Sequence, residues 1–261
     1  MSPLAQTMTP LSEWLDLLAQ TPLPAQERES VERELRIFAD AVSSQDEAVL
    51  SASIEALSSL LARHSIPALQ VKVLAVFVEA TQDTSRRAFG WLNLGTSHAD
   101  LGQHSEARLA FERALATFRE TNHTEGAASV LLGQGNIHRA LSEFAPARAA
   151  YEQALAQTKS LPKKLRILEN WIGLELDESR HGPGRSLCEE WLNLAEVDDF
   201  ESPRLPYVLH DYGLIGRRFL ISGDREAAES IATRCVELSA RASLNAEVVC
   251  AELFDELRRQ Q

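Results

Sequence analysis

Two histidines are the residues whose type and spacing come nearest to a chemical site. His98 and His138 lie 40 residues apart, and each follows a glycine, Gly95 or Gly135, by three positions. Imidazoles at equivalent positions of neighbouring elements could bind a metal ion together or act as a pH-sensing pair. The alternative is that both rings pack between helices in place of a larger aromatic side chain. We favour packing, because the sequence has no cluster of Cys and His at ligand spacing.

The other residue types that serve catalysis are scattered along the chain. Cys188, Cys235 and Cys250 show no paired metal spacing, and Cys188, near an expected turn, has no adjacent base that would activate its thiol. The Gly-Gln-Gly run at 133–135 falls within an expected helix, where it is a poor phosphate loop. No H-E-x-x-H or G-x-S-x-G motif is present. We therefore expect no catalytic residue, no metal site and no cofactor.

The composition favours a helical protein with a buried core. Of the 261 residues, 44% are hydrophobic and 25% are charged, with only 12 Gly and 10 Pro. The formal net charge of −12 argues against direct binding to nucleic acid, because phosphates require a basic surface. An acidic protein suits a basic partner or simply good solubility.

The same features predict a cytoplasmic protein that does not enter a membrane. Residues 1–14 lack the basic start and apolar run of a secretory signal. No stretch reaches the roughly 18 apolar residues that a membrane span needs. The three cysteines form no even disulfide framework, which fits a reducing compartment.

An internal repeat organises the middle of the chain. The segment that begins at Trp91, WLNLGTSHADLGQHSEARLAFERAL, matches the segment that begins at Leu131, LLGQGNIHRALSEFAPARAAYEQAL, at a constant offset of 40 residues. Such self-similarity is typical of helical arrays. The matched positions keep similar residue types: Gly95 and Gly135, His98 and His138, Leu101 and Leu141, Ala107 and Ala147, and Phe111 and Tyr151.

Two further copies extend the repeat. In the third, 40 residues on, Gly182 takes the Gly102 position, whereas Glu175 replaces the glycine of position 95 and makes the copy degenerate. The fourth copy, 41 residues further, again has glycine at both positions. We therefore predict four repeats over residues 84–244.

Each copy is predicted to fold as two helices joined by a tight turn. Residues 91, 94, 95 and 98 share one helical face, and Gly102 can take the left-handed conformation that ends the helix. Gly95 on the first helix and Ala107 on the second would let the two axes approach closely, while Phe111 fills the gap between hairpins. Gly133 and Gly173 also indicate close approach, either by a neighbouring helix, which we favour, or by a ligand.

These residues resemble a known family. Trp91-x-x-Leu94-Gly95, followed by Ala107-x-x-x-Phe111, is similar to the tetratricopeptide signature, whose usual period is about 34 residues. The longer period here resembles the extended variant of kinesin light chains, bacterial peptide-pheromone receptors and the sensor regions of large bacterial transcriptional activators. The resemblance implies an all-α fold, a right-handed α-solenoid of antiparallel helical hairpins.

Both ends of the array are expected to be helical. Residues 1–83 form either divergent hairpins or a packed N-terminal extension, with Thr9 and Pro10 starting the first helix and a capping box of Ser44 and Glu47 starting a later one. The acidic stretch 196–206 is expected to be a long connection. Residues 245–261 form a C-terminal capping helix that begins at Asn245.

Candidate ligand contacts follow from the resemblance, because the first helix of each hairpin lines the concave face of such an array. Asparagine side chains there suit an extended peptide, since an amide can pair with a backbone N–H and C=O. The same asparagines also occur in repeats without a ligand. The candidate residues for binding protein or peptide are Phe89, Asn93, Asn136, Arg139, Arg180, His210 and Arg217.

Two functions remain open from the sequence. The first is a scaffold that binds a protein or peptide on its concave face. The second is the ligand-sensing tetratricopeptide module of a bacterial transcriptional or signalling regulator. We do not expect an enzyme, and the partner and the oligomeric state do not follow from the sequence.

Overall fold

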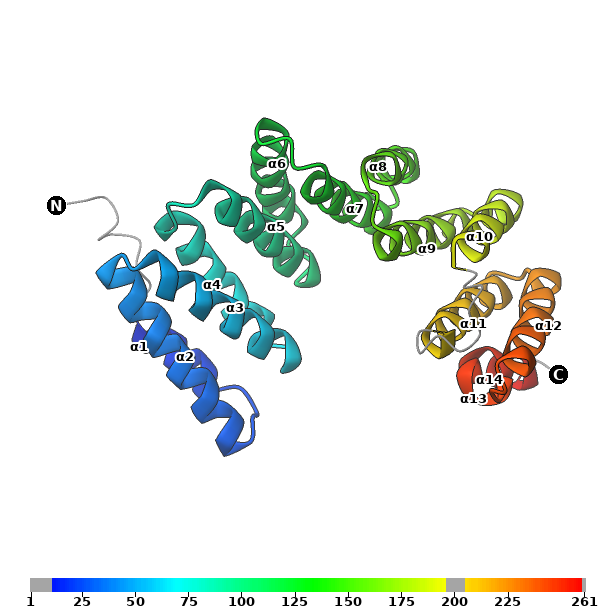
Figure 1. The fold of residues 1–261 in the computed structure, drawn as a ribbon, viewed down its shortest axis with the longest axis horizontal. Coiled ribbons are helices and arrows are strands. Elements are labelled where there is room, and N and C mark those ends of the chain that lie inside the picture. Colours follow the sequence, from blue (N-terminus) through cyan, green and yellow to red (C-terminus); the bar gives the residue numbers. More distant parts are fainter. Residues whose placement is uncertain (1–10, 196–204, 260–261) are drawn as a thin grey trace. The chain divides into compact units, whose positions relative to one another are not determined.

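The computed structural model describes residues 11–195 and 205–259, and every regular element in these ranges is a helix. The expected helix start at Thr9 and Pro10 lies outside them, as does most of the expected connection at 196–206. No helix of the described ranges combines the length and the apolar character that crossing a bilayer requires. The helices are α1 (Leu11–Ala19), α2 (Ala25–Ser44), α3 (Glu47–Arg63), α4 (Pro67–Ala80), α5 (Thr84–Asp100), α6 (His104–Glu120), α7 (Thr124–Ala140), α8 (Phe144–Gln157), α9 (Leu161–Asp177), α10 (His181–Ala195), α11 (Leu205–Ile221), α12 (Arg225–Arg241), α13 (Ala246–Val249) and α14 (Ala251–Arg259) (Figure 1).

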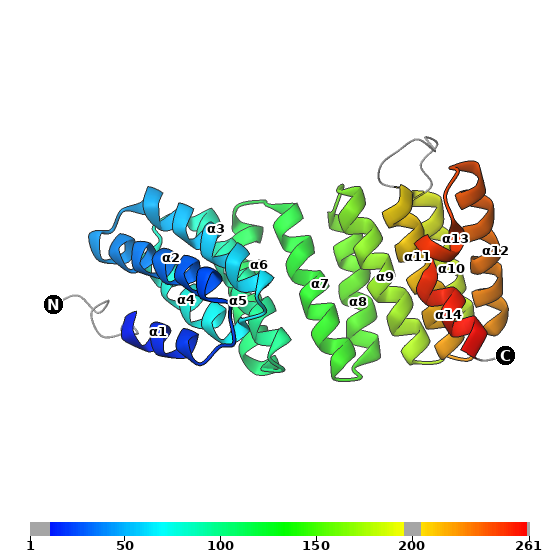
Figure 2. The same ribbon diagram turned by 90° about the horizontal axis from the view of Figure 1, so that it is seen from below.

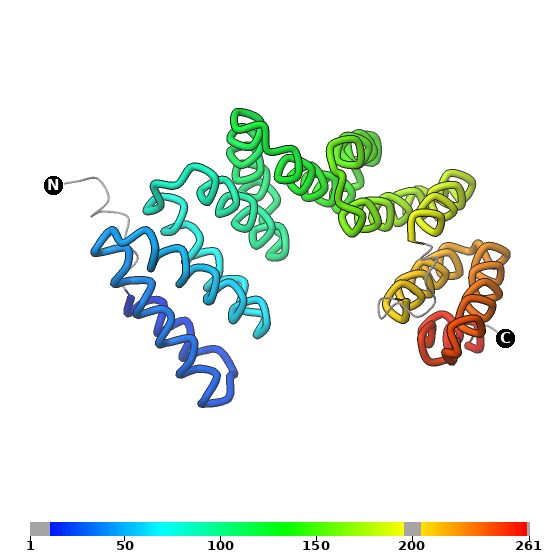
Figure 3. Tube along the Cα trace, viewed as in Figure 1, coloured from blue at the N-terminus to red at the C-terminus, as the bar shows by residue number. Residues whose placement is uncertain are grey.

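Several of the turns between consecutive helices hold one residue in the left-handed region, and the chain reverses direction there (Figure 3). Gly102 has φ +71° as predicted, and the N–H of Gln103 donates to the carbonyl of His98 at 2.9 Å. Ser142 takes the same role after α7, with φ 58°. These turns satisfy carbonyl groups at the helix ends and join the helices into antiparallel hairpins, so the predicted all-α hairpin fold is confirmed.

The 40-residue register is wrong for the third repeat. Helix α7 begins at Thr124, 40 residues after α5, but α9 begins at Leu161, only 37 residues later. The cause is α8, which has 14 residues where α6 has 17. Ser179, with φ 57°, therefore makes the turn, and Gly182 lies inside α10. The fourth repeat returns to the predicted register, with Gly223 in its turn at φ 93°.

The corrected register places Glu175 at the position of His98 and His138. All three residues pair with the side chain five positions later, at the start of the next helix. His98 Nδ1 lies 2.6 Å from Gln103 Oε1, and His138 Nδ1 lies 2.5 Å from Glu143 Oε2. Both histidines thus contact the turn of their own hairpin, in line with a structural role. Across the described ranges, no three His, Cys, Asp or Glu residues gather closely enough to hold a metal ion.

Residues 11–137 form the first of two compact units. Helices α2 to α6 each pack on the preceding helix, over a core that includes Trp14, Phe38 and Phe77. Phe111 of α6 is also buried, with an exposure of 1%. A Cβ atom added at Gly133 would lie 2.5 Å from Phe111 Cζ, so a neighbouring side chain explains this glycine, as we favoured.

Residues 138–259 contain the described part of the second unit. Trp191 of α10 stacks on Tyr212 of α11 with a ring separation of 5.9 Å and an interplanar angle of 5°. Helix α14 packs on α11, burying Leu253 and Leu257 (Figure 2). A Cβ atom at Gly216 would lie 2.7 Å from Leu253 Cδ2, which shows how closely the C-terminal helix approaches.

An ion pair also joins the last two hairpins. Arg185 of α10 donates through Nε to Asp224 Oδ2 at 2.7 Å, and Asp224 caps α12 by accepting from the N–H of Ala227 at 3.2 Å. Asp224 is 5% exposed. The hydrogen bonds from Arg185, together with its charge and the bond from Ala227, hold the pKa of this carboxyl below its ordinary value.

Replacing Asp224 with asparagine should lower Tm at pH 7 by a few degrees, because asparagine keeps the cap but loses the charge. A lowered pKa means that the ion pair stabilises the fold above the ordinary value of 3.8 and loses this effect as pH falls below it. Thermal melts from pH 7 to 3 should therefore show the gap between parent and variant closing. Glu226→Gln is the control, since Glu226 contacts the same arginine but its side chain is 83% exposed; a gap as wide at the acid end of this range as at pH 7 would contradict the prediction.

Candidate functional site

A pocket of about 360 Å³ in the first unit is a candidate site. It lies between α3 and α5, with α4 beneath them, and all of its lining residues belong to these three helices. The residues that line it are Ser51, Ile54, Glu55 and Ser58 of α3, Leu74 and Phe77 of α4, and Arg86, Phe89, Gly90 and Asn93 of α5.

The turn before α5 holds the two walls of the pocket in place. Glu47, the first residue of α3, accepts hydrogen bonds from the Thr81 hydroxyl at 2.5 Å and from the N–H of Gln82 at 3.0 Å. The capping box expected from Ser44 and Glu47 is therefore wrong, because Asp46 caps α3 and Glu47 is committed to this distant turn. The Glu47 carboxylate accepts from one O–H and one N–H donor, and it thus anchors α3 to the turn before α5.

The floor of the pocket is apolar and close-packed. Phe77 is 3% exposed and Leu74 is 1% exposed. Gly90 brings α5 down onto α4, because a Cβ atom there would lie 2.7 Å from Val78 Cγ1. The base of the pocket is therefore filled by buried side chains of α4.

Phe89 forms a rigid apolar wall. Its ring meets Phe118 edge to face at 5.0 Å between centroids, and His123 at 5.3 Å. The N–H of Gly126 donates to His123 Nδ1 at 2.9 Å, which fixes the imidazole at the start of α7. Phe89 is 41% exposed, so the side of its ring that faces away from these contacts offers an aromatic surface.

Three polar residues of the pocket make no hydrogen bond or ion pair with any described residue: Glu55, Ser58 and Asn93. Glu55 and Asn93 are exposed, and Ser58 is half-buried. Their donors and acceptors point to a ligand of mixed character, because an apolar cavity with a few available polar groups is typical of binding sites.

The arginines predicted to bind a ligand are instead held by ion pairs. Arg139 Nε donates to Asp177 Oδ2 at 2.6 Å, and its guanidinium lies where a Cβ atom of Gly173 would be. Arg217 Nη1 lies 3.0 Å from Glu252 Oε2 and so joins α11 to α14. Both side chains contribute to packing between helices of the second unit.

The remaining predicted residues are not among those that line the pocket. Arg180 is in the turn after α9, where Nη1 lies 3.1 Å from Glu175 Oε2. His210 is exposed on α11 beside Asp211, and Asn136 is exposed on α7. Of the seven predicted contacts, the structure brings Phe89 and Asn93 together in this pocket.

The α3 wall was missed from the sequence, although a signal was available. Ser51, Glu55 and Ser58 recur at i, i+4 and i+7, one position after the apolar series of Leu50 and Ile54. Small and polar residues at this spacing mark a helix face that lies beside the core rather than in it. No repeat signature in residues 1–83 assigned that face to a groove.

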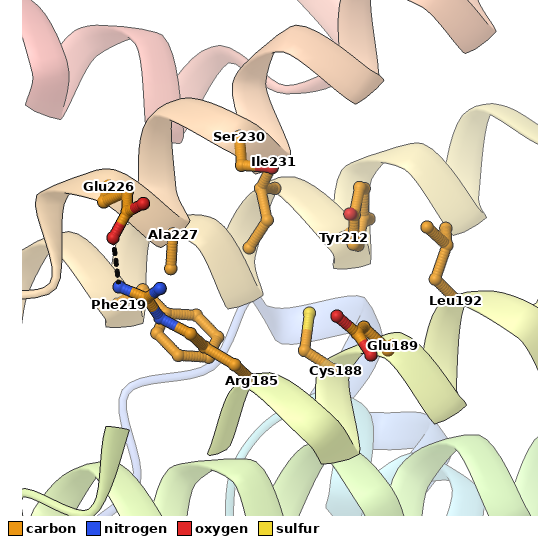
Figure 4. Close-up of a pocket in the computed structure, with 10 residues that line it drawn as sticks. All are labelled: Arg185, Cys188, Glu189, Leu192, Tyr212, Phe219, Glu226, Ala227, Ser230 and Ile231. Atoms are coloured by element: carbon orange, nitrogen blue, oxygen red, sulfur yellow. Dashed lines mark hydrogen bonds and ion pairs between the residues drawn. The ribbon is translucent and has the colours of Figure 1, made fainter. Parts of the chain in front are cut away.

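A second pocket, of about 210 Å³, lies in the second unit between α10, α11 and α12 (Figure 4). Arg185 meets Glu226 at one end, and Leu192 and Tyr212 lie at the other. Cys188 lines the pocket from within α10 and does not lie near the turn expected from the sequence. Its side chain is buried, with an exposure of 6%. Burial, with a smaller effect of a neighbouring carboxylate, raises the pKa of its thiol to about 12. This thiol is therefore protonated and unreactive at neutral pH.

Comparison with known proteins agrees with the repeat geometry. Residues 86–160 match the tetratricopeptide repeat family. BtubC (BKLC) from P. vanneervenii has a similar structure, with a TM-score of 0.61 and 16% identity over 90% of this chain and 93% of that one. A Podosopora anserina protein described as a kinesin light chain with nearly identical TPR-like repeats has a TM-score of 0.57 and 17% identity, over 74% and 95% of the two chains.

At these identities the two structures share the fold with this chain and nothing more is carried over from them. The search of curated proteins found no match. By sequence, residues 86–160 match the tetratricopeptide repeat family. The helical hairpins in the rest of the described chain share the fold of the two similar structures.

Proposed function

We propose that this chain is a peptide-binding scaffold and that the pocket between α3 and α5 is its binding site. Tetratricopeptide repeats generally mediate protein–protein interaction and are typically not enzymes. One observation carries the assignment to this pocket. An apolar cavity of about 360 Å³ coincides with three polar side chains that have no partner among the described residues.

The pocket has the size and chemistry for one large side chain of an extended peptide. Its volume falls in the range of small-ligand sites, roughly 300–1,000 Å³. Phe77 and Phe89 would contact the apolar side chain. The carboxamide of Asn93 can donate to a peptide carbonyl and accept from a peptide N–H at the same time. Binding would thus combine an apolar anchor with a backbone contact that does not depend on sequence.

Peptides selected from a random phage-displayed library should bind the parent and lose affinity for two variants. We expect a loss of about tenfold for Asn93→Ala, which removes both backbone hydrogen bonds, and at least as much for Phe89→Ala, which removes the aromatic wall. Fluorescence anisotropy with labelled peptides measures both, and circular dichroism checks that the helices persist.

The matched control is Asn193→Ala, which removes an exposed asparagine from the second helix of a different hairpin. Its affinity should equal that of the parent. Unchanged affinity in Asn93→Ala and Phe89→Ala, or failure of the library to yield any binding peptide, would remove the case for this pocket.

A further inference from the structure

We infer that the pocket between α3 and α5 selects peptides that carry Lys or Arg next to a large apolar residue, and that Glu55 is the charged contact. This inference rests on the proposed peptide-binding function. It concerns the charge of the ligand, because peptide binding in a groove does not by itself determine that charge.

Two charged side chains line the pocket, and only one of them is compensated. Arg86 donates through Nη1 to the Ser51 hydroxyl, and carboxylate oxygens of Glu47 and Asp83 lie 4.0 and 3.9 Å from its guanidinium. Glu55 has no cationic neighbour within ion-pair distance among the described residues. The charge that the pocket presents to a ligand is therefore negative.

The positions of these groups along α3 fit one ligand side chain in the cavity and one beside it. Ser51, where Arg86 is held, is one helical turn before Glu55, and Ser58 is about one turn after it. A cation at Glu55 would lie at the rim while an apolar neighbour enters the cavity against Phe77 and Leu74. Lys and Arg suit this position, because their long aliphatic stems can lie along apolar surface while the charge stays in water.

An acidic ligand is disfavoured by the same geometry. To reach Arg86 it would have to approach the carboxylates of Glu47 and Asp83, which lie 4.0 and 3.9 Å from the guanidinium, and that of Glu55, which lines the same pocket. The formal net charge of −12 adds a long-range attraction for cationic partners and a repulsion for anionic ones.

The test uses three labelled peptides with one Phe in a Ser-Gly background, flanked on both sides by Lys, by Gln or by Glu. Anisotropy titrations of the full chain at about 20 mM salt should rank them Lys above Gln above Glu. Because Glu55 is exposed, we expect about fivefold between successive peptides, shrinking at about 500 mM salt. In Glu55→Gln the differences among the three affinities should shrink, and in Glu55→Lys the ranking should reverse.

Glu79→Lys is the matched control, since it makes the same change of charge at an exposed position of α4 outside the pocket. It should keep the parent ranking. Two results would overturn the inference: a ranking that is the same in Glu55→Lys as in the parent, or one that reverses equally in Glu79→Lys. In either case affinity that still depends on Phe89 and Asn93 would leave peptide binding intact. If neither these peptides nor library-selected ones bind at all, the proposed function fails as well.

Discussion

Replacing Glu175 with alanine is expected to lower the free energy of unfolding by about 3 kcal/mol. This carboxylate is 1% exposed; two side chains donate hydrogen bonds to it and a third forms an ion pair with it. Arg148 Nε lies at 2.7 Å, Arg180 Nη1 at 3.1 Å and the indole Nε1 of Trp171 at 2.9 Å. Without Glu175, the partly exposed Glu178 would be the one carboxylate among the described residues left beside the two guanidinium groups, and the indole N–H would lose its acceptor.

The protonation state supports a strong network. Burial raises the pKa of Glu175, but the hydrogen bonds from Arg148 and Trp171 and the charges of Arg148 and Arg180 outweigh it, so the pKa lies below the ordinary value. The carboxyl group is therefore ionised at neutral pH. The stabilisation that the ionised Glu175 gives to the fold is lost only in acid, as pH falls below the ordinary pKa of 4.5.

Chemical denaturation at pH 7 measures the effect, and Glu178→Ala provides the comparison. Glu178 pairs with the same two arginines, but its side chain is 35% exposed, so its loss should cost less than about 1 kcal/mol. Equal small losses in the two variants would mean that the buried position of Glu175 has no energetic consequence.

The hairpins over residues 84–140 could be predicted because local and tertiary signals agree there. Gly102 meets the left-handed turn that its position requires, and the small residue Gly95 coincides with a close helix contact. The positions of the helices and the turn in the third hairpin could not be predicted in this way. Helix α8 is three residues shorter than α6, and a glycine happens to stand at 182, where the 40-residue period expects one.

One wall of the candidate site could be predicted and the other could not, for a related reason. Phe89 and Asn93 could be proposed from the resemblance to tetratricopeptide repeats, because α5 carries the repeat signature. The opposite wall, with Glu55, belongs to α3, whose sequence has no such signature. The partner of Arg139 was also out of reach, since Asp177 lies 38 residues away at the end of the helix whose register had shifted.

Replacing Phe111 with alanine is expected to cost about 4 kcal/mol in the free energy of unfolding. The ring is 1% exposed and is held from two sides. Cβ atoms added at Gly95 and Gly133 would lie 2.5 Å from Phe111 Cδ1 and Cζ, respectively. Because the ring fills the space between two glycine-faced helices, its removal leaves a cavity that rigid helices can close only in part. Denaturation of Leu109→Ala, which shortens a 61% exposed side chain of the same helix, should show little loss.

The same contacts predict that two glycine-to-alanine substitutions destabilise the parent but stabilise the variant that lacks Phe111. Cavity formation alone does not predict this change of sign. In the parent, Gly95→Ala and Gly133→Ala should each destabilise, because the ring cannot move away from one new methyl group without approaching the other helix. In the Phe111→Ala background the clash is absent, and each alanine should stabilise by up to about 1 kcal/mol through its higher helix propensity. Gly182→Ala, where no atom lies within 4 Å of the added Cβ, should behave alike in both backgrounds. If the two glycine substitutions stabilise the parent as well, Phe111 is not clamped between the helices, and the close approach of hairpins has another cause.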